Sequence, residues 1–274
     1  MSFNPIYKLL DWIDINKLNW WQLSKNPKAI YLLEQNPEKI DWNFLSRNPN
    51  AIHLLEGNLD KIDWYWLSGN PNAIHLLQKN FNKINWCSLS SNPNALFLLE
   101  RNIDKIYWVE LSSNPNAIHL LERNLDKINW TGLSINPNAL FLLEQNPDKI
   151  DFDFLSLNPN AIHLLEQHFD KIYWTWLSKN SNAIHLLQSN FPKIYWPFLS
   201  RNPNAIDLLQ ANPEKIDWEW FSYNPSIFEL DKNAMKQQIK DFYRELQEVC
   251  FHPRRVERYL EEFNYDMGED CMET

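Results

Sequence analysis

Histidine, lysine and tryptophan recur in this sequence at a fixed spacing of 22 residues. Clustered histidines bind metal ions, a row of lysines binds phosphate groups, and exposed tryptophans stack on nucleic-acid bases. Each function depends on whether the repeated residues converge on one point or lie along a surface. The structure of the repeat therefore decides which chemistry is open to the protein.

The histidines that share one repeat position are spaced too widely for a metal site. Equivalent residues in stacked repeats lie roughly 8 to 10 Å apart, whereas ligands must converge within about 4 Å. Other copies carry Tyr31, Phe97, Phe141 or Asp207 at this position. We therefore predict no metal site and expect a solvent-exposed ladder. Its histidines are His53, His75, His119, His163 and His185.

The lysines form the most regular charged column, which in isolation could follow a phosphate backbone. An acidic residue directly precedes the lysine in most copies, as in Asp60-Lys61 and Asp104-Lys105. We therefore expect local ion pairs on a solvated face. The column comprises Lys17, Lys39, Lys61, Lys83, Lys105, Lys127, Lys149, Lys171, Lys193 and Lys215.

The tryptophans could form a base-stacking column, but Phe152 replaces one of them and an isoleucine lies two residues before most of them. Both features favour a role in the core. The column comprises Trp20, Trp42, Trp64, Trp86, Trp108, Trp130, Trp174, Trp196 and Trp218.

No pattern of a catalytic site is present. Four glycines cannot supply a phosphate-binding loop or a dinucleotide fingerprint, and neither an HExxH motif nor a nucleophile elbow occurs. We therefore predict a protein that is not an enzyme and that has no catalytic residues, no metal and no cofactor.

Charge and composition restrict the partners. The net charge of −9 is opposite to the basic surface that nucleic acids require. No segment approaches the 18 or so apolar residues of a membrane span, and charged residues interrupt the N-terminal segment where a signal peptide would be apolar. The spacing of Cys87, Cys250 and Cys271 fits neither a disulfide framework nor a zinc site. An intracellular protein without a membrane partner is the simplest interpretation.

Internal repeats define the domain organisation. The array spans residues 1–230, with a degenerate first copy at 1–22, nine full copies at 23–220 and a partial copy at 221–230. Two amphipathic helices are predicted within 231–264, and residues 265–274 lack a core-forming pattern and are predicted to be a disordered tail.

Each copy predicts two short helices. In residues 48–56, Asn48 is a suitable N-cap, Pro49 fits the first helical position, and the apolar residues that follow share one face. The second helix begins after Asp63, which is its predicted cap. The rival is a leucine-rich repeat with a buried asparagine ladder, but the adjacent pair Leu54-Leu55 lacks the alternation of a strand.

The fold class is therefore all-α: an α-solenoid of about ten two-helix repeats with a C-terminal helical cap. One copy cannot bury enough surface to fold alone, so neighbouring repeats must stabilise each other. Ten layers at helix-packing distance would make a rod or gentle superhelix of roughly 80 to 100 Å. The helices at 231–264 would close its open end.

The unit LSxNPNAIHLLExNxDKIxW resembles the 22-residue repeats of uncharacterised proteins from giant nucleocytoplasmic DNA viruses of the mimivirus and chlorella virus type. Residues 252–260 (HPRRVERYL), followed by Tyr265-Asp266, resemble a closing motif of the same proteins. The resemblance covers nearly the whole chain. It implies a role in the host cytoplasm or in a virion, and it implies no catalytic residues.

Specificity is expected where the copies disagree, as at Arg47, Tyr65, Trp66 and their counterparts. One variable column is aromatic at both ends of the array and small or polar in the middle, which predicts either a recess for a partner or a packing adjustment. Its members are Phe44, Trp66, Ser88, Glu110, Gly132, Phe154, Trp176, Phe198 and Trp220.

Together these features favour a non-enzymatic scaffold that presents an extended surface to a protein partner. The first alternative is a virion or assembly component whose rod length is its purpose. The second is a nucleic-acid-binding repeat protein, which the acidic charge disfavours.

Overall fold

The computed structural model describes residues 5–262. Their regular elements are helices, apart from one short pair of strands. This confirms the predicted all-α class and the helical repeat. The chain divides into two compact units. Residues 9–229 form the first and contain the repeats, whereas the described residues 5–8 and 230–262 belong to the second.

Each repeat consists of two short α-helices and a 3-10 helix. In one copy these are α9 (Trp108–Ser112), α10 (Ile118–Glu122) and η6 (Leu125–Lys127). The core between neighbouring repeats is formed by an alanine, a serine and several leucines and isoleucines, such as Leu111, Ala117 and Leu121, which are fully buried.

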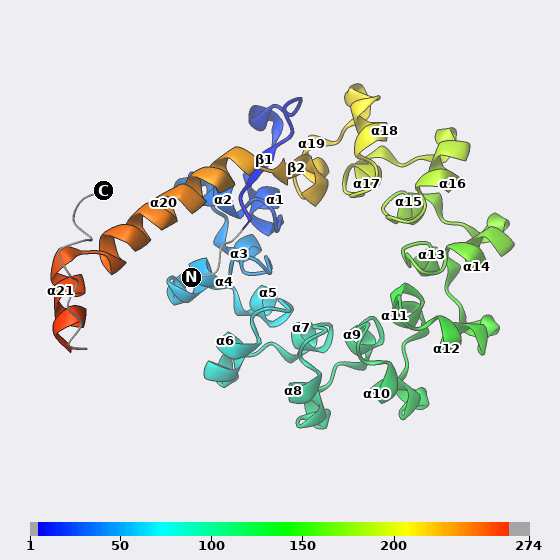
Figure 1. Cartoon of the computed structure of the whole chain (residues 1–274). Coiled ribbons are helices and arrows are strands. Elements are labelled where there is room, and N and C mark those ends of the chain that lie inside the picture. The colour runs from blue at the N-terminus through cyan, green and yellow to red at the C-terminus, as the bar shows by residue number, and fades with distance from the viewer. Residues whose placement is uncertain (1–4, 263–274) are drawn as a thin grey trace. The chain divides into compact units, whose positions relative to one another are not determined.

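The repeats of residues 9–229 are arranged in a ring, with one series of helices on the inside and a second series on the outside (Figure 1). The inner helices are α1 (Trp20–Lys25), α3 (Trp42–Leu45), α5 (Trp64–Ser68), α7 (Trp86–Ser90), α9, α11 (Trp130–Ile135), α13 (Phe152–Leu155), α15 (Trp174–Leu177), α17 (Trp196–Ser200) and α19 (Trp218–Phe221). We number the layers 1 to 10 by these helices, from α1 to α19.

The outer helices and the 3-10 helices complete each layer. The outer helices are α2 (Ile30–Glu34), α4 (Ile52–Glu56), α6 (Ile74–Lys79), α8 (Leu96–Glu100), α10, α12 (Leu140–Glu144), α14 (Ile162–Gln167), α16 (Ile184–Ser189) and α18 (Ile206–Gln210). The 3-10 helices are η1 (Ile15–Lys17), η2 (Pro37–Lys39), η3 (Leu59–Lys61), η4 (Phe81–Lys83), η5 (Ile103–Lys105), η6, η7 (Pro147–Lys149), η8 (Phe169–Lys171), η9 (Phe191–Lys193), η10 (Pro213–Lys215) and η11 (Pro225–Ile227).

A buried asparagine links each layer to the one before it. Asn114 donates from Nδ2 to the backbone carbonyls of Ser90 and Asn92, at 3.0 and 2.9 Å, and its Oδ1 accepts from the N–H of Asn116 at 3.0 Å. Equivalent asparagines form the same contacts in every layer. The ladder comprises Asn26, Asn48, Asn70, Asn92, Asn114, Asn136, Asn158, Asn180, Asn202 and Asn224.

The same contacts join the last layer to the first. Asn26 donates from Nδ2 to the carbonyls of Ser222 and Asn224, at 3.1 and 3.0 Å. The N–H of Asn19 donates to Ser222 Oγ at 2.8 Å, which repeats the bond from Asn129 N–H to Ser112 Oγ inside the array. Residues 9–229 therefore form a closed ring, and the predicted open rod is wrong. Small rotations between layers, which the repeat sequence does not reveal, add up to a full turn.

The two incomplete copies lie at the point of closure. Layer 10 has no outer helix. In its place the chain forms strand β2 (Phe228–Leu230), which pairs with strand β1 (Tyr7–Leu9) from the other end of the array. The N–H of Leu10 donates to the carbonyl of Ile227 at 3.0 Å. The degenerate first copy and the partial last copy together make one layer.

The predicted helix starts are partly correct. Asp63 caps α5 as predicted, since its Oδ1 accepts from the N–H of Trp66 at 3.2 Å. Asn48, in contrast, begins a turn in which Ala51 N–H donates to its carbonyl, and α4 begins only at Ile52. The Oδ1 of Asn48 caps this turn by accepting from the N–H of Asn50 at 3.0 Å, while its Nδ2 joins the ladder.

The second unit contains two helices, α20 (Lys232–Cys250) and α21 (Pro253–Glu262), which confirms the predicted C-terminal helices. Asp231 caps α20 by accepting from the N–H groups of Asn233 and Ala234. Their predicted role as a cap loses its basis, because the first repeat covers the last. The proposed tail at 265–274 and the Tyr265-Asp266 motif lie outside the described residues. Among residues 5–262, no helix is long and apolar enough to cross a membrane.

Candidate functional site

The predicted partner-binding column lies on the inner helices, at the third residue of each helix from α3 to α19. All its members are half-buried except Gly132, which is buried. The members are Phe44, Trp66, Ser88, Glu110, Gly132, Phe154, Trp176, Phe198 and Trp220. The structure therefore places them on one face, as the sequence predicts, but closes that face into a circle.

Ring closure brings the aromatic ends of this column together. The ring centroids of Trp176 and Phe198 are 5.1 Å apart, and those of Phe198 and Trp220 are 6.4 Å apart. On the other side of the closure, Phe44 and Trp66 are 6.5 Å apart. Trp220 in layer 10 and Phe44 in layer 2 are distant in the sequence, yet only layer 1 separates them in the ring.

Layer 1 has a buried glutamine at the equivalent position. Gln22 is 1% exposed, and its Nε2 has no hydrogen-bond partner. Its Oε1 accepts from Lys25 Nζ at 3.4 Å. The neighbouring Trp21 lies 4.8 Å from the ring of Phe44. The point of closure therefore holds a buried donor between two aromatic segments.

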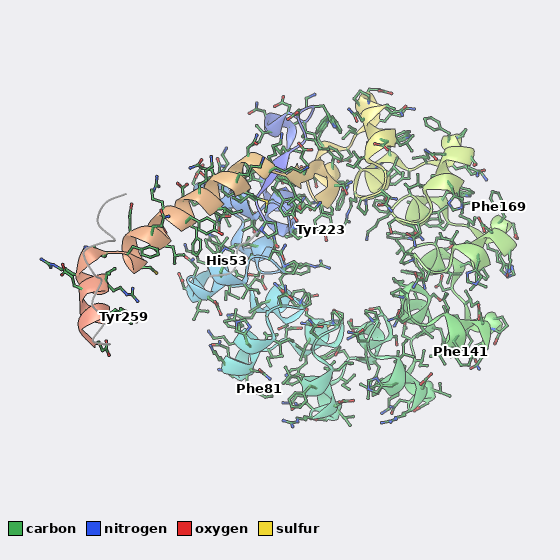
Figure 2. All side chains as sticks on the ribbon, viewed as in Figure 1. His53, Phe81, Phe141, Phe169, Tyr223 and Tyr259 are labelled. Carbon is green, nitrogen blue, oxygen red and sulfur yellow. The ribbon has the colours of Figure 1, made fainter. Side chains whose placement is uncertain are left out.

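Four cations lie beside this aromatic surface, and we call them the seam cations: Lys25, Arg47, Lys179 and Arg201. Each follows the buried serine of its repeat, in layers 1, 2, 8 and 9. In layer 10 this position is Tyr223, which Figure 2 shows at the inner edge of the ring. The corresponding residues of layers 3 to 7 are uncharged: Gly69, Ser91, Ser113, Ile135 and Leu157.

Three of the seam cations, Lys25, Arg47 and Arg201, pack on aromatic rings. Lys25 Nζ lies 3.9 Å from the centroid of Phe44, and Arg47 Cζ lies 5.1 Å from that of Trp66. Arg201 Cζ lies 4.7 Å from Trp220 and 4.9 Å from Tyr223. These contacts hold positive charge against the inner surface in a protein of net charge −9.

Burial and mutual repulsion destabilise the charged forms. Burial, followed by the charges of Arg201 and Arg47, lowers the pKa of Lys179 to about 8. Burial also lowers the pKa of Lys25 to about 8; Arg47 and Arg201 add to this, and Asp41 and Glu219 oppose it. Burial is again the largest cause of the lowered pKa of Arg201.

The middle of the column does not form the predicted recess at Gly132. A Cβ added there would lie 2.9 Å from the carbonyl oxygen of Val109 and 3.3 Å from Cβ of Ser112. The absence of a side chain therefore lets α9 and α11 approach each other. At this residue the packing interpretation is correct.

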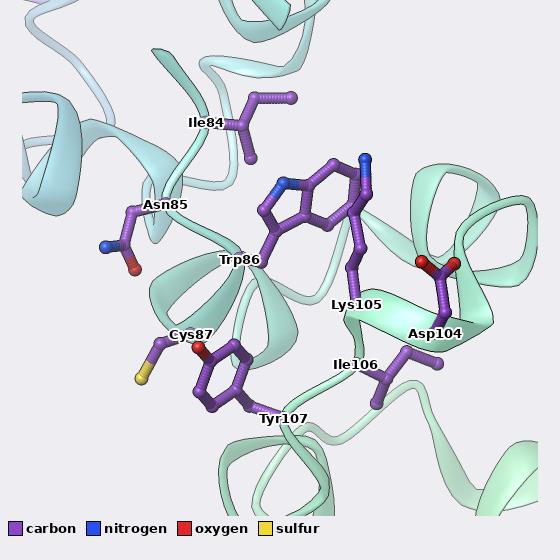
Figure 3. Close-up of a pocket in the computed structure, with 8 residues that line it drawn as sticks. All are labelled: Ile84, Asn85, Trp86, Cys87, Asp104, Lys105, Ile106 and Tyr107. Atoms are coloured by element: carbon purple, nitrogen blue, oxygen red, sulfur yellow. The ribbon is translucent and has the colours of Figure 1, made fainter. Parts of the chain in front are cut away.

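A shallow pocket of about 500 Å³ lies between layers 4 and 5 (Figure 3). Its lining includes Trp86, Cys87, Lys105 and Tyr107. Burial, together with a hydrogen bond to Glu110, raises the pKa of the Cys87 thiol. This thiol is therefore a weaker nucleophile at neutral pH than an ordinary cysteine.

Comparisons with protein families, curated proteins and solved structures find no match.

The lysine column lies over aromatic rings rather than beside carboxylates. Each lysine approaches the column aromatic of the preceding layer, as Lys127 does at 4.6 Å from the centroid of Trp108. The series continues across the closure, where Lys17 lies 4.9 Å from Trp218. Within the described chain, none of the ion pairs includes a lysine of this column, so the predicted local pairs are corrected to cation–π contacts between layers.

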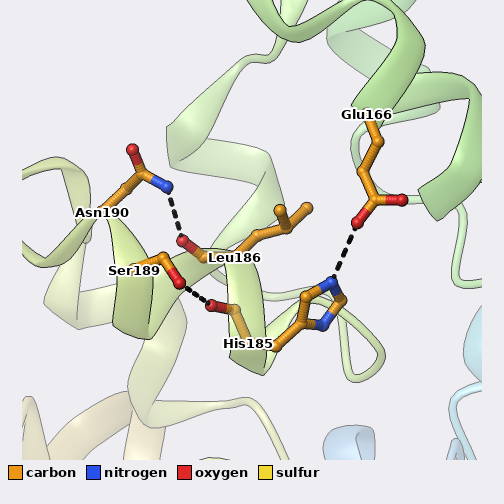
Figure 4. A network of polar contacts seen from close by, with 5 residues as sticks. All are labelled: Glu166, His185, Leu186, Ser189 and Asn190. Atoms are coloured by element: carbon orange, nitrogen blue, oxygen red, sulfur yellow. Dashed lines mark hydrogen bonds and ion pairs between the residues drawn. The ribbon is translucent and has the colours of Figure 1, made fainter.

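The histidine column forms side-chain hydrogen bonds between layers. Each histidine Nε2 lies 2.7 to 3.3 Å from a glutamate of the preceding outer helix. In Figure 4, His185 reaches Glu166 at 3.2 Å, while Ser189 and Asn190 bond to carbonyls of their own helix. No group of three or more potential metal ligands occurs among the described residues.

Proposed function

We propose that this protein is a non-enzymatic interaction scaffold, in which a closed ring of helical repeats binds a partner protein on its outer surface. The residues that recur in every layer are buried or paired with the next layer. The exposed positions are therefore the ones available for recognition.

The observation that carries this proposal is a row of exposed apolar side chains, the outer apolar row: Leu59, Phe81, Ile103 and Leu125. These begin the 3-10 helices η3 to η6 of consecutive layers and are 43%, 44%, 56% and 56% exposed. Figure 2 shows Phe81 at the outer edge of the ring. Exposed apolar residues grouped in this way are typical of protein-interaction surfaces.

The viral resemblance of the repeat supports a role in an infected cell or in a virion. The alternative of a structural component rested on the length of an open rod, and the closed ring removes that reason. Nucleic-acid binding is disfavoured by the acidic charge. The inner aromatic rings also stack on one another and on cations, which leaves their faces less open to bases.

Affinity capture from the native cell tests the proposal. The bait is the full chain, compared with a triple variant of the outer apolar row, Leu59→Ser, Ile103→Ser and Leu125→Ser. A matched control carries Tyr31→Ser, Phe97→Ser and Phe141→Ser, which are exposed apolar residues at the histidine position. Thermal unfolding establishes that all three proteins are folded.

We expect one host or viral factor to be enriched on the wild-type and control rings and lost on the triple variant of the outer apolar row. That factor, when purified, should bind the wild-type ring directly. Equal recovery on all three baits would contradict the proposed surface. Enrichment of capsid proteins instead would favour the structural role.

A further inference from the structure

The seam cations come from opposite ends of the repeat array and meet only because the ring is closed. Lys179 and Arg201 belong to layers 8 and 9, whereas Lys25 and Arg47 belong to layers 1 and 2. The ten-layer circle places these layers on either side of layer 10. Their positive charge is therefore concentrated on one arc of the inner face.

The side chains converge rather than follow the ring as a line. The four cations occupy the same position of their inner helices, directly after the buried serine, and layers 8, 9, 1 and 2 flank layer 10 on the inside of the ring (Figure 1). Residues on the inside of a curved stack approach one another more closely than in a straight stack, where four layers would span roughly 30 to 40 Å. The lowered pKa of Lys179, to which the charges of Arg201 and Arg47 contribute, agrees with this approach.

The cluster has more positive charge and more donors than its surroundings can satisfy. The two carboxylates that act on Lys25 are those of Asp41 and Glu219. Asp41 also caps α3 through its Oδ1, and Glu219 is exposed. Lys179 has only cations among the charges that shift its pKa. The cluster thus lacks an internal counter-charge of matching size.

Two buried donors on this arc also lack an acceptor. Arg201 Nε and Gln22 Nε2 are buried and have no hydrogen-bond partner in the protein. Leaving a buried donor unpaired destabilises the fold. Half-buried cations, such as Lys179 and Arg201, and buried unpaired donors on the same arc are both relieved by a bound anion.

We propose that the seam cations form a binding site for a compact anion that carries several phosphate groups. Arginine recognises phosphate oxygens through its planar, five-donor fork, and lysine adds a mobile point charge. Because the four cations converge across five layers, a compact ligand meets all of them, whereas an extended acidic peptide would meet them only in turn. The aromatic rings hold Lys25, Arg47 and Arg201 in place rather than bind the ligand.

This site links ligand binding to ring closure. The anion contacts layers from both ends of the array, so it binds the closed ring and not an opened one. A ligand that binds only one state stabilises that state. Closure without the anion must overcome the repulsion among the four cations.

Calorimetric titration with inorganic tripolyphosphate tests the site, at about 150 mM salt so that weak surface attraction is screened. The test variant is Lys25→Gln with Arg201→Gln. The control, Arg101→Gln with Arg123→Gln, removes the same charge from exposed residues in layers 4 and 5. Thermal unfolding is measured for each protein with and without the ligand.

We expect saturable binding of one equivalent by the wild-type and control proteins, and affinity at least about tenfold weaker in the test variant. Tripolyphosphate should raise the unfolding temperature of the wild-type protein, and the test variant should unfold at a higher temperature than the wild type when no ligand is present. The higher unfolding temperature of the test variant verifies that it loses binding without losing its fold.

Three results would overturn the proposal. The first is the absence of saturable binding to the wild-type protein, and the second is an equal loss of affinity in test and control variants. The third is tighter binding of a glutamate peptide of equal charge, which would assign the arc to an acidic protein segment. None of these results would bear on the outer apolar row, so the two proposals fail separately.

Discussion

At the scale of single residues, the asparagine of each repeat has a role that its sequence context does not reveal. An asparagine before proline at the start of a helical pattern predicts a helix cap. In the structure Asn114 is fully buried and bonds to the preceding layer. The side chain does both at once, since its Oδ1 caps a turn by accepting from the N–H of Asn116 and its Nδ2 donates to the preceding layer. A buried asparagine ladder is therefore not specific to leucine-rich repeats.

Replacing Asn114 by alanine should destabilise the fold by about 2 to 4 kcal/mol, because buried carbonyls of the preceding layer lose their donor. The matched variant Asn116→Ala removes an exposed donor, whose Nδ2 bonds to the carbonyl of Pro93. It should cost less than about 1 kcal/mol. Denaturant unfolding measures both, and equal losses would refute the ladder.

The buried Gly132 should not tolerate a side chain. Gly132→Ala places a Cβ 2.9 Å from a backbone oxygen, so the backbones of α9 and α11 must move apart. We expect a loss of about 1 to 3 kcal/mol. At Gly69 the nearest atom is 3.7 Å from such a Cβ, and Gly69→Ala should be neutral or slightly stabilising. Unchanged stability of Gly132→Ala would restore the interpretation as a recess.

The charge of Lys179 should make stability depend on pH in a defined direction. Its pKa is about 8 in the folded protein and 10.5 in an unfolded chain, so the cost of the charge is present below pH 8. Between these values only the unfolded chain keeps the proton, and stability rises with pH. Lys179→Met should therefore be more stable than wild type at pH 7, by about 1 to 3 kcal/mol.

The advantage of Lys179→Met should shrink as the pH rises toward 10. Denaturant unfolding of both proteins at several pH values, in buffers without phosphate, measures the difference. A difference that stays constant with pH would mean that the lysine is not the group that titrates.

At the scale of elements, the repeat sequence predicts most of the secondary structure. Aliphatic spacing gives the outer helices, and a polar residue before the tryptophan gives the inner ones. The 3-10 helices are not predicted, because three residues are too few to show a periodicity. The inner surface is only half predicted. The aromatic column and the variable position of Arg47 are found from the sequence, but the meeting of Lys25, Arg47, Lys179 and Arg201 depends on ring closure, which the sequence does not reveal.

Three inner helices have a tyrosine instead of Asp or Asn at the cap position, and they offer a test of these helices: Tyr107, Tyr173 and Tyr195. Tyr107 has an extended backbone like that of Asn129, but it makes no side-chain cap. Tyr107→Asn should add the missing bond to the N–H of Glu110 and stabilise the fold by about 0.5 to 1 kcal/mol. The reverse variant, Asn129→Tyr, should destabilise by a similar amount. Thermal unfolding of the pair shows whether the signs are opposite, as they must be if the cap is the cause.

At the scale of the array, residues 9–229, the repeat sequence determines how two neighbouring layers pack. It does not determine whether the small rotations between layers add up to a full turn. Each interface is fixed by Asn, Ser, Leu and Trp at constant positions, and those residues are compatible with an open superhelix or a circle. The signal of closure lies in the two incomplete copies, which complement each other. Incomplete first and last copies are also expected at the ends of an open array. The sequence therefore does not distinguish an open superhelix from a closed circle.

Closure gives layer 1 the same contacts to its neighbour as the layers in the middle of the array have. Asn26 bonds to Ser222 and Asn224 as Asn114 bonds to Ser90 and Asn92. Asn26→Ala should therefore cost as much stability as Asn114→Ala. At the free end of an open array it would cost almost nothing.

The most direct test is the distance across the closure, measured by double electron–electron resonance between two spin labels. The seam pair is Lys17→Cys with Glu219→Cys, and the matched pair inside the array is Lys61→Cys with Asn43→Cys, all four at exposed positions. Cys87, Cys250 and Cys271 are replaced by serine. A closed ring predicts the same short distance distribution for both pairs. A seam pair separated by roughly 60 Å or more, beside a short matched pair, would show an open array and contradict the account.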